Sequence, residues 1–315
     1  MFVFVAMVQM IGCAAAMKSP DVSASPFLIV LGAAQDAGSP QAGSFDEPGW
    51  EDATKVSRAS CLGIVDPRSG KRWMIEATPD FRSQLYDLHI AADGESKAEP
   101  SQPLSGVFLT HAHIGHYTGL MFLGHESMGA RGVPVYAAAR MTTFLSSNGP
   151  WSQLVQYGNI TLTPLVPGQA VELAPDLHVT PMLVPHRQEY SEVLAFVIEG
   201  PNRSVLFLPD IDSWKKLDEW DAPIEDLLKR VDVAYVDGTF FDDGEIPDRD
   251  MSGFPHPRIR ASISRFSRIA PDHRPTIRFI HLNHTNPAQY KDSAERRETL
   301  RAGFFIAHEL ERLEL

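Results

Sequence analysis

The sequence predicts a single α/β domain in which two β-sheets form a sandwich and helices cover its outside. Short apolar runs bounded by Gly, Pro and Asn alternate with segments of helical spacing, which is typical of α/β chains. Several of these runs end in a histidine or an aspartate, and α/β proteins place their chemistry at strand ends. With 315 residues and 43% hydrophobic content the chain can bury a large core, and nothing marks a second domain.

The balance of charged residues indicates which classes of ligand the protein can bind. The chain carries 28 Lys and Arg against 40 Asp and Glu, a formal net charge of -12. Phosphate affinity depends largely on Lys and Arg, so this balance argues against nucleic-acid binding through a broad basic surface. We expect a small-molecule or peptide substrate, and the sequence does not indicate an oligomeric state.

The first 16 residues predict a leader. Residues 1–12 are apolar but too short to cross a bilayer, as a secretory signal is, and Ala14–Ala16 offers a small-residue cleavage site. The segment 10–13 also resembles a bacterial lipoprotein signal, in which Cys13 would be lipidated and would anchor the protein to a membrane. We therefore expect a periplasmic or secreted protein, either free or anchored as a lipoprotein. The alternative is a first strand of the fold or a misplaced start codon, in a cytoplasmic protein.

The folded domain is expected to span residues 26–315. Residues 26–32 predict a strand, and the Gly- and Pro-rich segment 33–43 a loop. Residues 61–66 and 72–77 predict a hairpin around the turn 67–70. The small, polar residues 91–103 show no periodicity and predict an exposed insertion.

Three histidines follow the next apolar run. Residues 106–109 predict a short buried strand that leads to His111, His113 and His116. On an extended backbone His111 and His113 project to the same side, and His116 from a first helical turn can point into the same space. Neutral imidazoles are favoured zinc ligands, so this stretch predicts a metal site. A helix is expected to continue from it to about Gly129.

The rest of the chain alternates between strands and helices. After a strand at 133–137 and helical spacing over 140–151, strands are expected at 159–165, 177–185, 193–200 and 204–210. A helix at 221–231 is expected to lead to a strand at 233–238, and a strand at 276–282 to a helix at 292–303 and a closing strand. Polar side chains stand at or just after several of these strand ends, namely His186, Asp210, Asp237, His281 and His284.

The segment HAHIGH at 111–116 resembles the HxHxDH signature of the metallo-β-lactamase fold superfamily. Further segments follow in the family's order: IEATPD at 75–80, VPH at 184–186, FLPD at 207–210 and FIHLNHTNP at 279–287. The resemblance extends from about residue 27 to the end and implies a four-layer αββα sandwich. Within the superfamily the chain is most similar to the branch of the pyrroloquinoline quinone biosynthesis protein B, through HLNHTNP, DGTFFDDGE at 237–245 and SAERRETLRAGFFIAHE at 293–309.

The resemblance implies two metal sites that share one carboxylate. The first would be formed by His111, His113 and His186, and the second by His116, Asp210 and His281, with Asp210 bridging. Zinc is the expected metal, as one or two ions, and iron or manganese is the alternative because histidine and carboxylate ligands suit them as well.

Gly115 departs from the family signature, which has an aspartate ligand of the second metal at this position. In one interpretation the protein holds one metal at the first site, with Asp210 nearby. In the other, His284 moves in to complete the second site. We expect two ions of unequal affinity, because the remaining ligand-type residues would otherwise have no partner.

Four more acidic and histidine residues are singled out. Glu76 is expected to hold the outer nitrogen of a ligand histidine. Asp36 is expected either to touch the substrate at the mouth of the site or to form a turn. By resemblance to ribonuclease Z, His256 would be a proton donor oriented by Asp237, although both could simply hold their loops.

These residues predict a metal-dependent hydrolase. Activated water would attack an ester, amide or phosphodiester, with Asp210, His256 and Asp237 as catalytic groups. The alternatives are an iron-dependent oxidase or oxygenase in pyrroloquinoline quinone biosynthesis or another maturation pathway, and a non-enzymatic carrier of a quinone-like acid.

Overall fold

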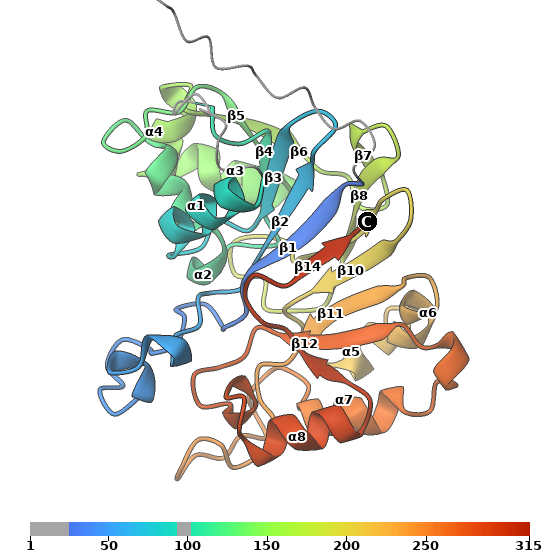
Figure 1. Ribbon diagram of the computed structural model, residues 1–315. Helices are drawn as coiled ribbons and strands as arrows, with labels where there is room; N and C mark the ends of the chain where they lie inside the picture. The colour runs from blue at the N-terminus through green and yellow to red at the C-terminus, as the bar shows by residue number, and fades with distance from the viewer. Residues whose placement is uncertain (1–24, 93–101) are drawn as a thin grey trace, which may run out of the picture.

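Two seven-stranded sheets pack face to face, and helices cover both outer faces (Figure 1). The computed structural model describes residues 25–92 and 102–315. The predicted four-layer αββα sandwich in a single domain is therefore confirmed.

The first sheet has the order β14-β1-β2-β3-β4-β5-β6. The hairpin expected around residues 67–70 is present, because β2 and β3 pair antiparallel. Strands β3, β4, β5 and β6 run parallel to one another. Its strands are β1 (Phe27–Gly32), β2 (Cys61–Asp66), β3 (Lys71–Ile75), β4 (Gly106–Phe108), β5 (Val133–Ala137), β6 (Ile160–Pro164) and β14 (Arg312–Glu314).

The second sheet has the order β13-β12-β11-β10-β9-β8-β7. Strands β10, β11, β12 and β13 are parallel, and β7, β8 and β9 complete the sheet as antiparallel strands. Its strands are β7 (Val171–Ala174), β8 (Leu177–Leu183), β9 (Leu194–Glu199), β10 (Ser204–Leu208), β11 (Val233–Asp237), β12 (Thr276–Ile280) and β13 (Phe305–Ile306).

The helices fall into two groups, one for each sheet (Figure 1). Those beside the first sheet are α1 (Phe81–Ala91), α2 (Ile114–Tyr117), α3 (Ala139–Ser147) and α4 (Trp151–Gln156), and those beside the second are α5 (Trp214–Asp218), α6 (Ile224–Leu228), α7 (Ile259–Phe266) and α8 (Ala294–Arg301).

The strands are apolar on both faces because each sheet is buried on both sides. In β1, Leu28 and Val30 point into the core between the sheets, whereas Ile29 and Leu31 point into the core under the first helix layer. This alternation follows from the two-residue period of a strand.

The segment after the histidines differs from the prediction. Instead of one helix to Gly129, a single turn of α2 leads into a 3₁₀ helix, η3 (Thr118–Leu123). The Gly119 amide donates to Ala77 O at 2.8 Å, and a Cβ at Gly119 would lie 2.2 Å from Thr78 O, so the chain is held tightly against the end of β3. This anchor to β3 replaces the regular helix that the local spacing favours. Strand β7 and helices α1, α5 and α7 were not expected either.

Several predictions concern residues outside the described part. The leader at 1–16 with Cys13 lies outside it, as does most of the insertion at 91–103, since α1 extends to Ala91. Among the residues of 25–92 and 102–315, no helix has the length and apolar character required to cross a membrane.

The parallel strands determine where the site forms. Strands β3 and β4 are parallel in one sheet, and β10, β11 and β12 are parallel in the other, so their carboxyl ends lie at shared edges. The residues that end or follow these strands include Glu76, His111, Asp210, Asp237 and His281. The sandwich thus brings together side chains that are far apart in the sequence.

Candidate metal centre

Three groups of possible metal ligands lie together among the described residues; the third, Asp237, His256 and His281, shares His281 with the second. The first consists of His111, His113, His186 and Asp210, and the second of Asp36, His116, Asp210 and His281; within each group the ligand atoms lie within 4.8 Å of one another. Six of the seven residues predicted as ligands therefore come together in the first and second groups.

Asp210 belongs to both the first and the second ligand group and lies between their histidines. Its Oδ1 lies 3.1 Å from His186 Nε2, and its Oδ2 lies 3.4 Å from His111 Nε2. The same Oδ2 lies 3.7 Å from His116 Nε2 and 3.8 Å from His281 Nε2. One carboxylate thus faces histidines of both groups, as a bridging ligand must.

Each ligand histidine has an oxygen at its outer nitrogen. The contacts are His111 Nδ1 to Thr110 Oγ1 (2.8 Å), His113 Nε2 to Glu189 Oε2 (3.1 Å), His116 Nδ1 to Glu76 Oε1 (3.2 Å), His186 Nδ1 to Asp212 Oδ1 (3.0 Å) and His281 Nδ1 to Thr239 Oγ1 (3.0 Å). Four of these contacts are hydrogen bonds, and the contact of His116 with Glu76 is an ion pair without hydrogen-bond geometry. When a metal binds, an oxygen at the outer nitrogen can hold the proton there and leave the inner nitrogen as the ligand atom. Glu76 lies where it was predicted to lie.

The residues present fit a divalent ion. His111 Nε2 and His113 Nδ1 face each other at 2.7 Å, and with protons on the outer nitrogens both are acceptors that lack a donor between them. Asp210 Oδ1 is buried and makes no hydrogen bond of acceptable geometry within the described residues. A cation between these atoms would satisfy all three, and imidazole with carboxylate is a donor set of transition metals.

The electrostatics favour the same conclusion. Burial raises the pKa of Asp210, but the charges of His186, His281 and His256 outweigh it and hold that pKa well below its usual range. Burial and the charge of His116 hold the pKa of His111 well below 6.5. The site therefore contains an ionised carboxylate beside a neutral imidazole, as metal binding requires.

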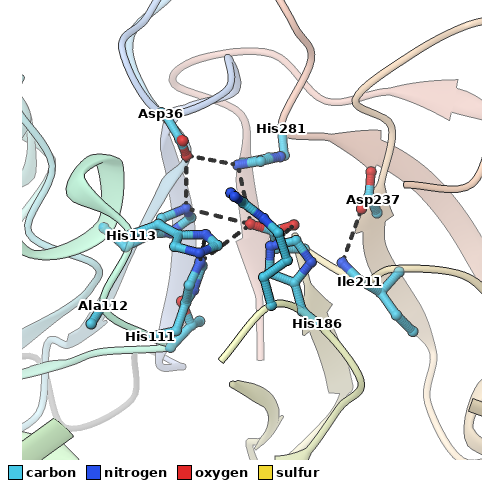
Figure 2. Close-up of polar contacts among 12 residues, drawn as sticks. Asp36, His111, Ala112, His113, His186, Ile211, Asp237 and His281 are labelled. Carbon is cyan, nitrogen blue, oxygen red and sulfur yellow. Dashed lines mark hydrogen bonds and ion pairs between the residues drawn. The ribbon is translucent and has the colours of Figure 1, made fainter. Parts of the chain in front are cut away.

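The second group contains a residue that was not predicted as a ligand. Asp36 Oδ1 lies 3.0 Å from His116 Nε2 and 3.4 Å from His281 Nε2 (Figure 2). Burial raises the pKa of Asp36, but the hydrogen bonds with these two histidines outweigh burial and hold the pKa below its usual range. The carboxylate is therefore ionised. The signal in the sequence is an aspartate just after a buried strand, but 80 residues separate it from His116.

The expectation that His284 completes the second site is wrong. His284 Nδ1 lies 2.9 Å from Glu47 Oε1, and His284 is in neither ligand group. His281 adopts φ +65°, and a turn closed by the Asn286 amide on Asn283 O carries the chain away from the cluster. The spacing of three residues suggested proximity, but the turn directs His284 toward another loop.

His256 and Asp237 lie beside the ligands. His256 Nδ1 is 2.8 Å from Asp237 Oδ2 and 3.2 Å from Asp210 Oδ1. Burial lowers the pKa of His256, but the charges of Asp237 and Asp210 raise it to about 9. Asp237 also accepts hydrogen bonds from the Ile211 amide at 3.0 Å and the Thr239 hydroxyl at 2.8 Å, which fixes its carboxylate.

Known proteins share this sequence pattern. A family model described as "Beta-lactamase superfamily domain" matches residues 71–273. "Coenzyme PQQ synthesis protein B" of Xanthomonas oryzae pv. oryzae (strain MAFF 311018) is 25% identical over 305 residues, which cover 90% of this chain and 97% of the relative. The protein of the same name from Pseudomonas protegens is 26% identical over 317 residues, covering 92% and 100%.

Solved structures share the fold. The Zn(2+)-bound PqqB from Methylobacterium extorquens superposes with a TM-score of 0.73 at 20% identity, covering 92% of this chain and 100% of that one. A diphosphatase from the PhnP family gives 0.63 at 20% identity, covering 93% and 98%, and the short form of human tRNase Z gives 0.55 at 13%, covering 91% and 98%. The family model spans more than half of the chain and the fold agrees with it, so this protein belongs to the beta-lactamase superfamily.

Proposed function

We propose that this protein is a metal-dependent hydrolase that cleaves an ester, amide or phosphodiester bond in a small molecule or peptide. The observation that carries the proposal is the complete first ligand group, His111, His113 and His186, next to a second group that shares Asp210 with it. Two-metal hydrolytic sites have this construction.

Bound divalent ions would lower the pKa of a shared water and stabilise negative charge on the attacked group. Asp210 faces both groups, and its charge offsets the repulsion between two cations. With a pKa of about 9, His256 carries a proton at neutral pH. Because Asp237 holds the Nδ1 of His256, Nε2 is the nitrogen left to donate a proton to the leaving group.

Zinc is the proposed metal. Imidazole-rich sites favour it, and the Methylobacterium extorquens PqqB structure is described as Zn(2+)-bound. Iron and manganese remain the alternatives, since the second group mixes two carboxylates with two imidazoles.

The surroundings of His113 favour a substrate with an apolar part. Its neighbour Ile114 is 65% exposed, and Tyr190, which follows the Glu189 that contacts His113, is 63% exposed. The Tyr190 ring packs 5.5 Å from that of Phe144. Exposed apolar side chains next to a polar site are typical of ligand-binding surfaces. Together with the net charge of -12, this favours an apolar small molecule or peptide over a polyanion.

The relatives favour a second candidate, a role in pyrroloquinoline quinone biosynthesis by iron-dependent oxidation or by carriage of the quinone. The similarity to coenzyme PQQ synthesis protein B covers nine-tenths of the chain, which supports a shared ligand chemistry. Iron in the purified protein with oxygen consumption would favour oxidation, and retention of a quinone without turnover would favour carriage.

The test uses full-length protein purified without added metal. Its metal is identified by mass spectrometry, and turnover is measured on chromogenic esters, amides and phosphodiesters. We expect zinc-dependent turnover that His111→Ala abolishes and His273→Ala, a change at an exposed histidine away from the ligand groups, preserves. Zinc-loaded protein that cleaves none of these probes would count against the hydrolase.

Export is proposed on sequence grounds, with Cys13 as a possible lipid anchor. Mass spectrometry of protein from the native cell should show the chain without its first residues. An intact Met1 would contradict export by this leader.

A further inference from the structure

Gly115 is packed against the loop that follows β1. A Cβ at Gly115 would lie 2.2 Å from Asp36 Cα and 2.7 Å from both Cβ and O of Asp36. These distances are far below van der Waals contact, and two of the three atoms belong to the backbone. Gly115 lies within helix α2 and does not adopt a left-handed conformation. Glycine is therefore needed here because there is no room for a side chain, and not because the backbone requires it.

The loop of Asp36 is fixed to the strand end that delivers His281. The Gln35 amide donates to Leu282 O at 2.7 Å, the Leu282 amide donates to Ala33 O at 2.9 Å, and Ala34 bridges to Leu282. The next turn closes through the Gly38 amide on Gln35 O at 2.8 Å. Asp36 thus has a fixed backbone on both sides, which holds its carboxylate in place.

The carboxylate of Asp36 points at the second group of ligands. It contacts His116 Nε2 and His281 Nε2 and lies with them and Asp210 in one cluster of ligand atoms (Figure 2). A turn-forming aspartate would hydrogen-bond to the backbone of its own turn. No such bond of the Asp36 carboxylate is present within residues 25–92 and 102–315.

We propose that Asp36 supplies the carboxylate of the second metal site in place of a side chain at position 115, and that Gly115 is required because only glycine leaves room for Asp36. The family signature HxHxDH carries its aspartate next to the last histidine, whereas this chain takes it from the loop after β1. The assignment rests on the proposed metal centre. The second site then takes its ligands from the loop after β1, from α2, from the segment after β10 and from the end of β12.

The experiment counts metal ions and measures their affinity in the full-length protein. The variants are Asp36→Asn, which keeps a turn-forming residue but removes the charge, and Gly115→Ala, which replaces no ligand but puts a methyl group where Asp36 now lies. The controls are Asp46→Asn, an exposed aspartate of the same loop region, and Gly253→Ala, where an added Cβ meets nothing within 4 Å. Ions are counted by elemental mass spectrometry after dialysis, and affinities come from competition with a chromophoric chelator.

We expect two ions in the wild type and in both controls. Asp36→Asn and Gly115→Ala should each keep one tight ion and weaken the other by more than the roughly 10- to 100-fold that loss of an outer contact costs. Helix propensity alone predicts no loss of metal affinity for Gly115→Ala, because alanine favours a helix over glycine. Should Gly115→Ala fail to fold, Asp36→Asn still decides the question.

Two results would overturn the assignment: an Asp36→Asn protein that retains two ions at wild-type affinity, or a wild type that never holds more than one ion. The outcome is separable from the hydrolase proposal. Two ions that depend on Asp36 in a protein without hydrolytic activity would leave the assignment intact and refute the hydrolase. Hydrolysis by an Asp36→Asn variant that keeps both ions would refute the assignment and leave the hydrolase proposal intact.

Discussion

Replacement of Asp210 by asparagine tests the shared carboxylate directly. Asparagine keeps the volume of the side chain but removes one negative charge from between the two ligand groups. Asp210 lies within 3.1 to 3.8 Å of inner nitrogens from His111, His116, His186 and His281, so both ions would lose their common anionic ligand.

The size of the effect follows from the distances. As a lower bound, unit charges about 4 Å apart interact by about 4 kcal/mol at an effective dielectric constant of about 20, which corresponds to about 1,000-fold in affinity; a divalent ion interacts more strongly with the same carboxylate. The asparagine carbonyl can still act as a weak ligand. We therefore expect each ion to bind about 100- to 1,000-fold more weakly to Asp210→Asn.

Competition with a chromophoric chelator measures both affinities, and circular dichroism verifies that the variant is folded. The matched control is Asp176→Asn, at an exposed position in the turn between β7 and β8 where φ is +61°. Asparagine accepts this conformation readily, so the control should bind metal like the wild type. A folded Asp210→Asn protein with two ions at near wild-type affinity would refute the bridging role.

Three further predictions concern an outer contact of a ligand histidine, the removal of the metal, and the pH dependence of stability. Asp212→Asn removes the carboxylate 3.0 Å from His186 Nδ1 and should weaken the first ion by about 10- to 100-fold in the same competition assay; no change would show that Asp212 does not orient His186. Chelation of the metal should lower the thermal midpoint, because an ion present at about 1,000 times its dissociation constant stabilises the fold by about 4 kcal/mol; equal midpoints with and without chelator would contradict a bound ion. Burial raises the pKa of Glu245 from 4.5 to about 7, so the folded protein keeps a proton that the unfolded chain releases. The free energy of unfolding of the wild type, relative to that of Glu245→Gln, should therefore fall as pH rises from about 4.5 to 7, by at most about 3 kcal/mol, and stay low at higher pH. Urea unfolding at several pH values measures both free energies. A constant difference between the two proteins across this range would contradict a buried, protonated carboxyl.

Much of the fold could be predicted from local patterns. The run at 26–32 is β1, the hairpin is β2 and β3, and the apolar runs before His186, Asp210 and Asp237 are β8, β10 and β11. These runs are recognisable because both faces of each sheet are buried. Strand β7 and helix α5 were missed because they are only four and five residues long, too short for a clear period.

The histidine site could be predicted only in part. His111 and His113 share a side because of the period of an extended chain, which the sequence shows directly. The positions of Asp36 and His284 could not be predicted from strand periodicity, because both residues lie in loops. Whether either reaches the cluster depends on how loops leave the strand ends, and this is decided by contacts such as that of the Gln35 amide with Leu282 O.

The amino-acid sequence by itself determined the strands, the residue types at their ends and hence a histidine and carboxylate chemistry, because these depend on local periodicity and side-chain identity. Only the tertiary structure decided which carboxylate joins His116 and His281, because that depends on the backbone contact between residues 36 and 115. Asp36 occupies the space that a side chain at position 115 would need, and the turn after His281 directs His284 toward Glu47.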